Sequence, residues 1–491
     1  MSDAQARYDA AMALYAQGQF EAAIAGLDDV LQTFPTIAAI HINRGLALWQ
    51  LQRFDEAIAS YGRAIACDPQ NAIAYNERGN AHYALGRNEQ ALFDFDAALA
   101  IHPDLRIARS NRAALLLRFE RYQEAADDVD HLLTLGSVDA ITHYNHALAR
   151  QACNQFALAM TSYEHCLQLD PGNVNALWNE AQCLLALGDY ANGWRKFEWR
   201  WQSANLKPYQ RRYAQPLWLG QEPLVGKTIL LWPDQGFGDV LQFCRYALLV
   251  QQMGAKVLLA TSPSLLRLFM QSFAGTGIIV VPDGEDVAFD FHAPLMSLPL
   301  ACGTDSLKRI PVYHPYLFAA PANAPQTIAH KGLRVGLVWA GGYRPHQPEL
   351  KSVDAARSLK LTQFAPLAAL TQTKSMQFFS LQLGEPAKQM ANVQDFPLID
   401  LTADLHDWAD TAALIASLDL VISCDTAVAH LAAAMGKPTW VLSRFNGCWR
   451  WLQDRDDSPW YPTVRLFRQK TRGDWAAVIA EVAAALASYN V

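Results

Sequence analysis

The sequence predicts an all-α superhelix followed by an α/β region of two doubly wound domains that face a cleft. Two observations lead to this prediction. The first is a period of 34 residues between Phe20 and Pro171, which is typical of stacked helical hairpins. The second is the alternation, from residue 227 onward, of short Val/Ile/Leu-rich runs with helical segments. That alternation indicates parallel sheets with helices on both faces.

Small residues and prolines recur in register along the first half. Alanine lets two helices approach closely, and proline ends the second helix of each hairpin. This spacing is that of the tetratricopeptide repeat, whose hairpins must stack to bury their apolar faces. We therefore expect a tetratricopeptide superhelix over residues 4–203, with five repeats and a degenerate sixth. The in-register residues are Ala23, Ala57, Ala91, Ala125 and Ala159, then Pro35, Pro69, Pro103 and Pro171, with Ser137 in the one slot that lacks proline.

Four large aromatic residues crowd the degenerate repeat, namely Trp194, Phe197, Trp199 and Trp201. In a helix, the spacing places Trp194, Phe197 and Trp201 on one face and directs Trp199 elsewhere. A terminal repeat normally presents a polar outer face, so these aromatics predict docking against the domains that follow.

Composition and charge exclude several classes of protein. The net charge of −7 over 491 residues argues against a general nucleic-acid binder, which would carry a basic patch. The eight cysteines are scattered without a C-x-x-C pair, which suits buried thiols in a reducing cytoplasm. The most apolar long stretch, 411–436, contains Asp419, Asp425 and His430 and is too polar to span a membrane. We expect a cytoplasmic protein without a membrane span or a nucleic-acid partner.

The second half divides into two expected domains, 204–325 and 326–491, around a Pro/Ala-rich crossing at 314–330. In doubly wound folds, ligands bind beyond the carboxyl ends of the strands, often between two domains. Candidate chemistry is therefore sought at those ends. The expected strands are 227–233, 255–260, 277–282 and 290–296, then 333–340, 376–383, 419–424, 439–443 and 463–469.

The first candidate is the turn P-D-Q-G-F-G-D that follows the first strand. Gly236 and Gly238 let the backbone turn sharply and approach a ligand, and Asp239 is expected to open a helix. Leu241 replaces the third glycine of a dinucleotide-binding motif, so the pattern alone is weak. Asp239 has two interpretations: a helix cap worth about 1 kcal/mol, or a carboxylate that faces the cleft as a general base.

The second candidate follows the strand 419–424. Asp425 and Thr426 begin a helix, and His430 lies one turn further along. A helix N-terminus of this kind binds anions readily, and small residues such as Ala427 permit close approach to a diphosphate. The alternatives are that Asp425 is a helix cap and that His430 is a hydrogen-bonded core histidine.

The third candidate is the polar loop 341–359, which carries Arg344, His346, Lys351 and Arg357. A solvated loop is the ordinary interpretation of such a run. Cations at the carboxyl end of a strand can instead neutralise a leaving diphosphate.

Together, the motifs at residues of about 205–491 resemble the heptosyltransferase-type enzymes of glycosyltransferase family 9, which have the two-domain GT-B fold. The matching pieces are G-F-G-D-V-L, R-V-G-L-V-W-A-G and D-T-A-V-A-H-L-A-A-A-M-G-K-P. The turn reads D-Q-G-F-G-D, whereas heptosyltransferases commonly have a serine-containing version. The fusion with tetratricopeptide repeats is similar in layout to O-GlcNAc transferase.

The resemblance implies an inverting transfer from a nucleotide-diphosphate sugar that needs neither a metal ion nor a bound cofactor. It also implies an acceptor side at 204–325 and a nucleotide-sugar side at 326–491. By this resemblance, the residues in question are Asp239 as the base, Gly236 and Gly238 in the turn before it, Asp425, Thr426, Ala427 and His430 at the donor diphosphate, and Lys351 or Arg357 as the phosphate-neutralising cation.

These observations predict a cytoplasmic glycosyltransferase of the hexosyl or heptosyl type, whose repeats recruit a protein or peptide acceptor. The alternative, from a different class, is a non-catalytic tetratricopeptide scaffold with a vestigial GT-B half. Nucleotide binding separates the two, because a ligand stabilises only a protein that binds it.

Overall fold

The computed structural model describes residues 2–136, 139–320, 332–342, 351–393 and 396–489. The chain divides into two compact units, Met1–Ala176 and Leu177–Val491. Residues 177–203, expected to end the repeat array, thus belong to the second unit. Within the described ranges, every helix is too short or too polar to cross a bilayer.

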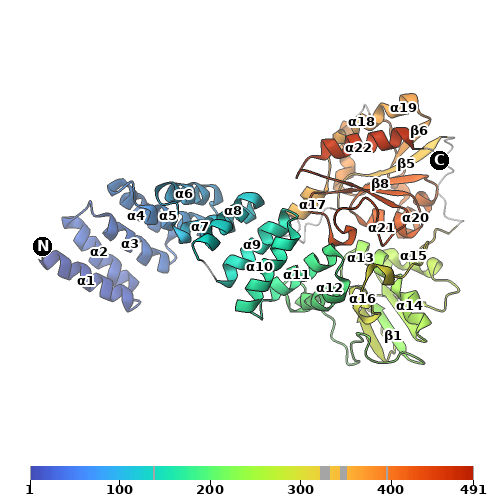
Figure 1. Cartoon of the computed structure of the whole chain (residues 1–491), viewed down its shortest axis with the longest axis horizontal. Helices are drawn as coiled ribbons and strands as arrows, with labels where there is room; N and C mark the ends of the chain where they lie inside the picture. The colour runs from blue at the N-terminus through green and yellow to red at the C-terminus, as the bar shows by residue number, and fades with distance from the viewer. Residues whose placement is uncertain (1, 137–138, 321–331, 343–350, 394–395, 490–491) are drawn as a thin grey trace. The chain divides into compact units, whose positions relative to one another are not determined.

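The first unit is a stack of antiparallel helical hairpins (Figure 1). Each helix packs on the next along the chain, because a single hairpin cannot bury its apolar face alone. This arrangement confirms the predicted all-helical superhelix. The helices are α1 (Ser2–Ala16), α2 (Phe20–Thr33), α3 (Ala38–Gln50), α4 (Phe54–Cys67), α5 (Ala72–Ala84), α6 (Asn88–Ile101), α7 (Arg106–Arg118), α8 (Tyr122–Thr134), α9 (Ala140–Ala152) and α10 (Phe156–Leu169).

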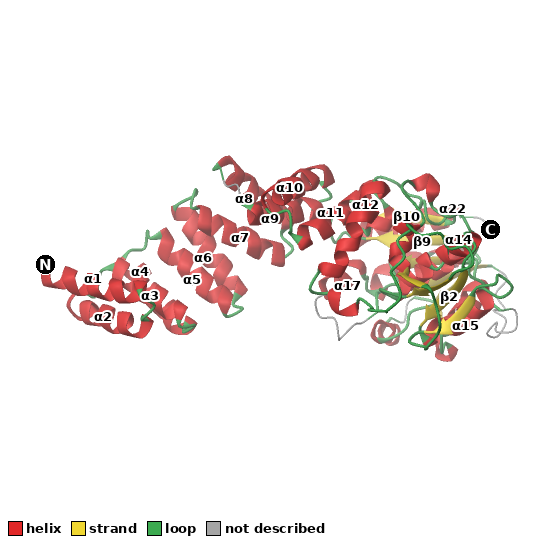
Figure 2. Ribbon diagram, turned by 90° about the horizontal axis from the view of Figure 1, so that it is seen from below, coloured by secondary structure: helices red, strands yellow, loops and turns green. Residues whose placement is uncertain are grey.

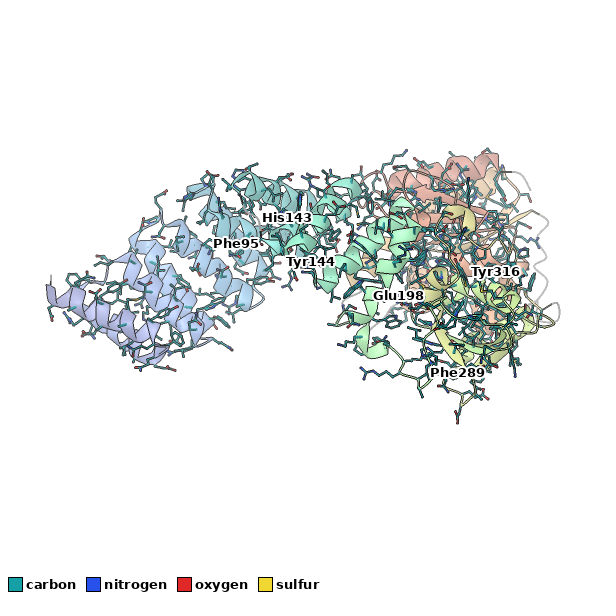
Figure 3. The ribbon with its side chains drawn as sticks, turned by 60° about the horizontal axis from the view of Figure 1, so that its bottom comes forward. Phe95, His143, Tyr144, Glu198, Phe289 and Tyr316 are labelled. Atoms are coloured by element: carbon teal, nitrogen blue, oxygen red, sulfur yellow. The ribbon has the colours of Figure 1, made fainter. Side chains whose placement is uncertain are left out.

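The in-register small residues lie where the helices cross. A Cβ atom added to Gly45 would lie 2.4 Å from the ring of Tyr61, and one added to Gly79 would lie 2.7 Å from the ring of Phe95. Phe95 is labelled in Figure 3. Each glycine thus makes room for an aromatic ring of the partner helix. The five repeated alanines are fully buried: Ala23, Ala57, Ala91, Ala125 and Ala159.

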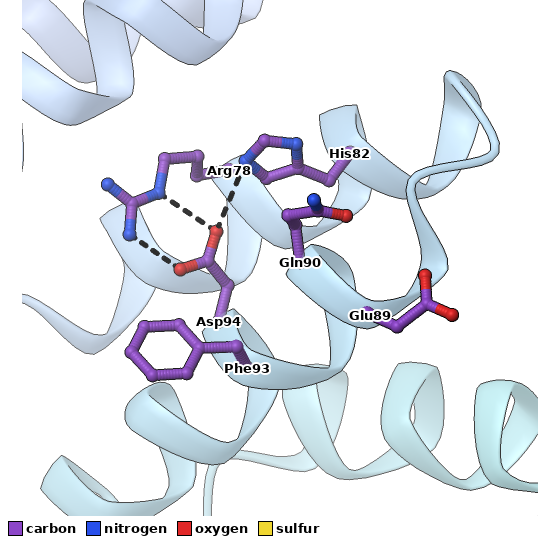
Figure 4. A pocket seen from close by; sticks show the side chains of 6 residues that line it. All are labelled: Arg78, His82, Glu89, Gln90, Phe93 and Asp94. Carbon is purple, nitrogen blue, oxygen red and sulfur yellow. Dashed lines mark hydrogen bonds and ion pairs between the residues drawn. The ribbon is translucent and has the colours of Figure 1, made fainter.

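Buried charges in the repeats pair with one another. Arg78 Nε donates to Asp94 Oδ2 at 2.8 Å, and the pair one repeat further, Arg112 and Asp128, has the same Nε to Oδ2 distance of 2.8 Å. The Arg78–Asp94 pair borders a cavity of about 330 Å³ (Figure 4). Because each carboxylate meets its guanidinium inside the array, these pairs are explained by packing. The cavity is also lined by His82, Glu89, Gln90 and Phe93.

The second unit contains two parallel sheets, drawn in yellow in Figure 2. This confirms the prediction of an α/β region with parallel sheets and helices. One strand, β7, was not predicted. The four-stranded sheet has the order β3-β2-β1-β4, with β1 (Thr228–Trp232), β2 (Lys256–Thr261), β3 (Ile279–Pro282) and β4 (Phe291–Pro294). The six-stranded sheet has the order β10-β9-β8-β5-β6-β7, with β5 (Leu333–Val338), β6 (Met376–Ser380), β7 (Leu398–Asp400), β8 (Leu420–Cys424), β9 (Thr439–Ser443) and β10 (Val464–Arg468).

Two helical stretches of this unit are interrupted. The stretch 237–252 is split, and Arg245 Nε donates to the carbonyl oxygen of Gln242 at the break. In the stretch 361–373, a new short helix begins next to Pro366, which lacks an N–H group. The helices are α11 (Val174–Leu187), α12 (Tyr190–Phe197), α13 (Phe237–Phe243), α14 (Tyr246–Gln252), α15 (Pro263–Ser272), α16 (Leu298–Ala301), α17 (Lys351–Arg357), α18 (Ala365–Ala368), α19 (Leu370–Thr373), α20 (Trp408–Ala416), α21 (Ala427–Ala434) and α22 (Trp475–Ser488).

The aromatic residues around α12 are packed inside the second unit. Trp194 is 1% exposed, Phe197 1% and Trp201 4%, whereas Trp199 is 39% exposed. This division matches the predicted faces. The ring of Trp194 lies 6.0 Å from the ring of Phe243 in α13 and 5.2 Å from that of Trp449, which follows β9. We call α12 together with the short turn that follows it, residues 190–202, the α12 segment. This segment is therefore part of the core that joins the two sheet-bearing lobes.

Truncation of Trp194 should destabilise the second unit. Trp194→Ala leaves a large buried cavity, and we expect a loss of about 3–5 kcal/mol. Trp199→Ala is the matched control, because a half-exposed ring loses little packing and should cost under about 1 kcal/mol. Thermal unfolding followed by tryptophan fluorescence measures both. Equal effects of the two substitutions would contradict a core role for Trp194.

Candidate functional site

The glycine turn after β1 starts α13. Gly236 is the N-cap residue, and the side chain of Asp239, three residues on, accepts the N–H of Gly236 at 3.0 Å through Oδ2. The expectation that Asp239 opens the helix is thus wrong by three residues, since glycine takes the extended N-cap conformation there. Asp239 nevertheless caps the helix, because its carboxylate binds the first N–H group.

The second carboxylate oxygen of Asp239 forms an ion pair with Arg450. Oδ1 accepts a hydrogen bond from Nη2 of Arg450. The Nη1 group of Arg450 donates to Cys448 Sγ at 2.9 Å, and its guanidinium lies 4.3 Å from the ring centre of Trp449. Burial alone would lower the pKa of Arg450, but the Asp239 carboxylate raises the pKa above its usual range. This pair could not be predicted from the sequence, because its members are 211 residues apart.

The turn lies directly against the start of α21. A Cβ atom added to Gly238 would lie 3.0 Å from Cδ2 of His430 and 3.7 Å from Cα of Ala427. Only a glycine permits this approach without displacing the histidine. The structure therefore brings together the first and second candidate motifs, one from each sheet-bearing lobe.

Thr426 is the N-cap residue of α21, and Asp425 precedes it. The interpretation of Asp425 as the cap is therefore incorrect. The hydroxyl group of Thr426 lies 3.0 Å from that of Ser423 and makes no hydrogen bond to the helix. Because no cap side chain covers this end, the first N–H groups of α21 remain available to an anion.

His430 is buried and neutral. Its Nδ1 lies 3.0 Å from the hydroxyl oxygen of Tyr461, and its ring stacks on Trp451 at 5.3 Å. Nε2 lies 3.8 Å from Oδ1 of Asp425. Burial lowers the pKa of His430 to about 3. His430 therefore fits the description of a hydrogen-bonded core histidine and also borders the candidate anion site.

This depressed pKa predicts loss of stability in acid. In the unfolded chain, His430 has its ordinary pKa of 6.5 and binds a proton below that pH. In the folded chain, the same side chain stays neutral until the pH reaches about 3. Stability therefore falls as the pH drops from 6.5 toward 3, by at most about 5 kcal/mol for this group. His430→Gln cannot titrate, so its unfolding temperature should depend less on pH over this window. Parallel pH curves for the two proteins would contradict the assignment.

Arg357 reaches the start of α21 from α17. Its Nη1 donates to the carbonyl oxygen of Asp425 at 3.2 Å, and its Nη2 lies 2.6 Å from Asp354 Oδ1. The segment around it, predicted as a loop, is helical. Lys351 is the first residue of α17, and its side chain lies outside the described structure. Arg344 and His346 also lie outside the described residues.

A buried network fixes the base of the turn, and sequence reasoning missed it. Asp234 Oδ2 accepts Nη2 of Arg200 at 3.0 Å, and Oδ1 accepts the N–H of Met296 at 3.1 Å. Burial raises the pKa of Asp234 to about 6. Arg200 is completely buried and also donates to Glu198, labelled in Figure 3, at 2.5 Å. The α12 segment thus anchors the strand end that carries the turn.

Protein-family models match segments in both halves of the chain. Residues 363–442 match the family model for glycosyltransferase family 9 (heptosyltransferase). Three tetratricopeptide-repeat models match residues 8–72, 72–105 and 140–173. The chain thus carries tetratricopeptide-repeat segments and a C-terminal segment that matches glycosyltransferase family 9. This matched segment includes α21 and leaves out the glycine turn and Arg357.

Relatives with known names or structures match in part. Protein FlbA of Caulobacter vibrioides is 27% identical over 340 residues, which are 63% of this chain and 54% of that protein. The chain therefore spans about half the length of this curated relative. Among solved structures, PilF of Pseudomonas aeruginosa is 18% identical with a TM-score of 0.37 and matches 42% of this chain and 93% of its own. A tetratricopeptide repeat protein of Parabacteroides merdae is 18% identical with a TM-score of 0.35 and matches 40% and 78%, respectively.

Proposed function

We propose that the chain is an inverting glycosyltransferase with a GT-B fold that takes its sugar from a nucleotide-diphosphate donor. The observation that carries this proposal is the contact between the glycine turn and the start of α21, where Gly238 lies against His430 and Ala427. A carboxylate from one lobe and an uncapped helix N-terminus from the other thereby border the same space. The family 9 match of residues 363–442 supports it.

The proposed reaction is a single displacement. Asp239 accepts the proton of the acceptor hydroxyl group while that oxygen attacks the anomeric carbon, and the bond from that carbon to the diphosphate oxygen breaks. Arg450 and the N–H of Gly236 hold the Asp239 carboxylate in place. Each carboxylate oxygen keeps acceptor capacity beyond these bonds, so the proton has a lone pair to enter.

The leaving diphosphate gathers negative charge as the bond breaks. The N–H groups that begin α21 and the guanidinium of Arg357 stabilise that charge without a metal ion. When the Tyr461 hydroxyl donates to Nδ1 of His430, Nε2 carries the proton and can donate to a phosphate oxygen. These groups are fixed before the donor arrives, which is how preorganised dipoles lower a barrier.

The repeats supply the acceptor specificity in this proposal. Stacked helical hairpins form an extended surface that suits a protein or peptide acceptor. The eight scattered cysteines, which include no C-x-x-C pair, suit a reducing compartment, and we place the reaction in the cytoplasm.

A thermal-shift screen over UDP, GDP, ADP and CMP tests the proposal. A nucleotide present at one hundred times its Kd should stabilise the folded chain by about 2.7 kcal/mol, which raises the melting temperature by several degrees. The free nucleosides at equal concentration are the control, because they lack the phosphates that α21 is proposed to bind. A scaffold with a vestigial domain would melt at the same temperature in every condition.

A further inference from the structure

Two further arginines leave the six-stranded sheet at the edge where α21 begins. Arg444 directly follows β9, and Arg468 is the last residue of β10. Strand pairing aligns Arg468 with Ser443, and Cys424 with Leu442. The two arginines therefore end their strands within about one residue of the level at which β8 passes into Asp425 and Thr426.

Neither arginine has an acidic partner in the described structure. No carboxylate oxygen of the described residues lies within 4.0 Å of either guanidinium. Within the same ranges, the side chain of Arg444 makes no hydrogen bond, and Arg468 donates only to the carbonyl oxygens of Arg455, at 2.9 Å, and Trp451. Burial lowers the pKa of both arginines.

A largely buried cation without a neighbouring anion is unfavourable for folding. The presence of two such arginines at this edge of the sheet therefore points to an external anionic ligand. The same edge carries Arg357 and the N-terminus of α21. Among the described residues, Asp354 pairs with Arg357 there, and the carboxylates of Asp425 and Asp454 act on the two further arginines only from beyond ion-pair distance. Two guanidinium groups are thus left without a directly paired carboxylate, which suits an anion with more than one charge.

We propose that Arg444 and Arg468 bind the diphosphate of the nucleotide-sugar donor, with Arg444 as a direct ligand. Guanidinium groups present paired N–H donors that match phosphate oxygens in geometry. This inference rests on the proposed function and adds two residues to the same site. It also assigns a role to a cation that pairs with no carboxylate in the described part of the chain.

Arg444→Gln in the full chain tests the assignment, with inorganic pyrophosphate in metal-free buffer as the probe and calorimetry as the readout. The loss of a charge-assisted contact should weaken pyrophosphate binding by roughly 10- to 100-fold. The melting temperature without ligand should stay the same or rise, because the substitution removes a largely buried charge that makes no hydrogen bond or ion pair with the described residues. A purely structural arginine would give the opposite shift.

Arg465→Gln is the matched control, because Arg465 lies on β10 as well but is exposed and stacks on Phe467 at 4.7 Å. It should leave pyrophosphate affinity unchanged. Arg468→Gln is a second test and should weaken binding by a similar factor. If wild-type protein binds a nucleoside diphosphate and Arg444→Gln binds it and pyrophosphate equally well, the arginine assignment is wrong and the proposed function stands. If wild-type protein binds neither pyrophosphate nor any of the four nucleotides, both fail.

Discussion

Asp239→Asn is expected to lower turnover by roughly 10²–10⁴-fold, the usual contribution of a positioned general base. Asparagine can still accept the N–H of Gly236, so the cap on α13 survives. Nucleotide affinity should change little, because the carboxylate faces the acceptor in the proposed reaction. Near-normal turnover would leave the assignment of Asp239 as the base without support.

The ion pair with Arg450 changes what this substitution does to stability. From the sequence, Asn at position 239 should be almost silent in stability. In the structure it leaves the buried guanidinium of Arg450 without its carboxylate, and breaking a buried pair in this way can cost about 3–5 kcal/mol. Turnover must therefore be measured on protein shown to be folded.

The double variant Asp239→Asn with Arg450→Gln separates the two effects. It removes the unpaired charge together with the carboxylate, so much of the lost stability should return. Turnover should stay low, because the base is still missing. Recovery of turnover along with stability would mean that Asp239 serves only as a counter-ion.

Thr426→Glu is expected to abolish nucleotide binding, with a loss of at least roughly 100-fold in affinity. The glutamate would place a negative charge and added bulk at the uncapped start of α21. The helix itself should tolerate the change, because a carboxylate near an N-terminus interacts favourably with the helix dipole. Thr426→Ser keeps the hydroxyl group near Ser423 and should bind nucleotide normally. Unchanged affinity in folded Thr426→Glu protein would move the donor site elsewhere.

Features that repeat or follow a local pattern could be predicted from the sequence. The repeats carry small residues in strict register, and packing requires small residues at those crossings. The strand predicted at 439–443 matches β9 residue for residue, because a short buried apolar run bounded by turns is typical of a parallel strand. The short strand β7 escaped prediction because its three residues include an exposed aspartate.

The polar partners around the candidate site could not be read from the sequence. Asp239 and Arg450 are 211 residues apart, and Arg200 and Asp234 are 34 apart. Arginines carry no periodicity that marks them as buried, so only the fold shows which carboxylate each one meets. The roles assigned to the Asp239 turn and to the Asp425–His430 segment remain predictions for the experiments above.

The placement of the α12 segment matters to anyone who wishes to graft the sheet-bearing unit onto another helical-repeat array. The boundary between the compact units falls inside α11, after Ala176. A chimera joined at residue 203 would discard Trp194 and Arg200, which pack on Trp449 and hold Asp234. A chimera joined in the first turn of α11 would keep them. The helical array that can be exchanged therefore ends at about residue 176, roughly one hairpin before the expected end of the repeats at residue 203.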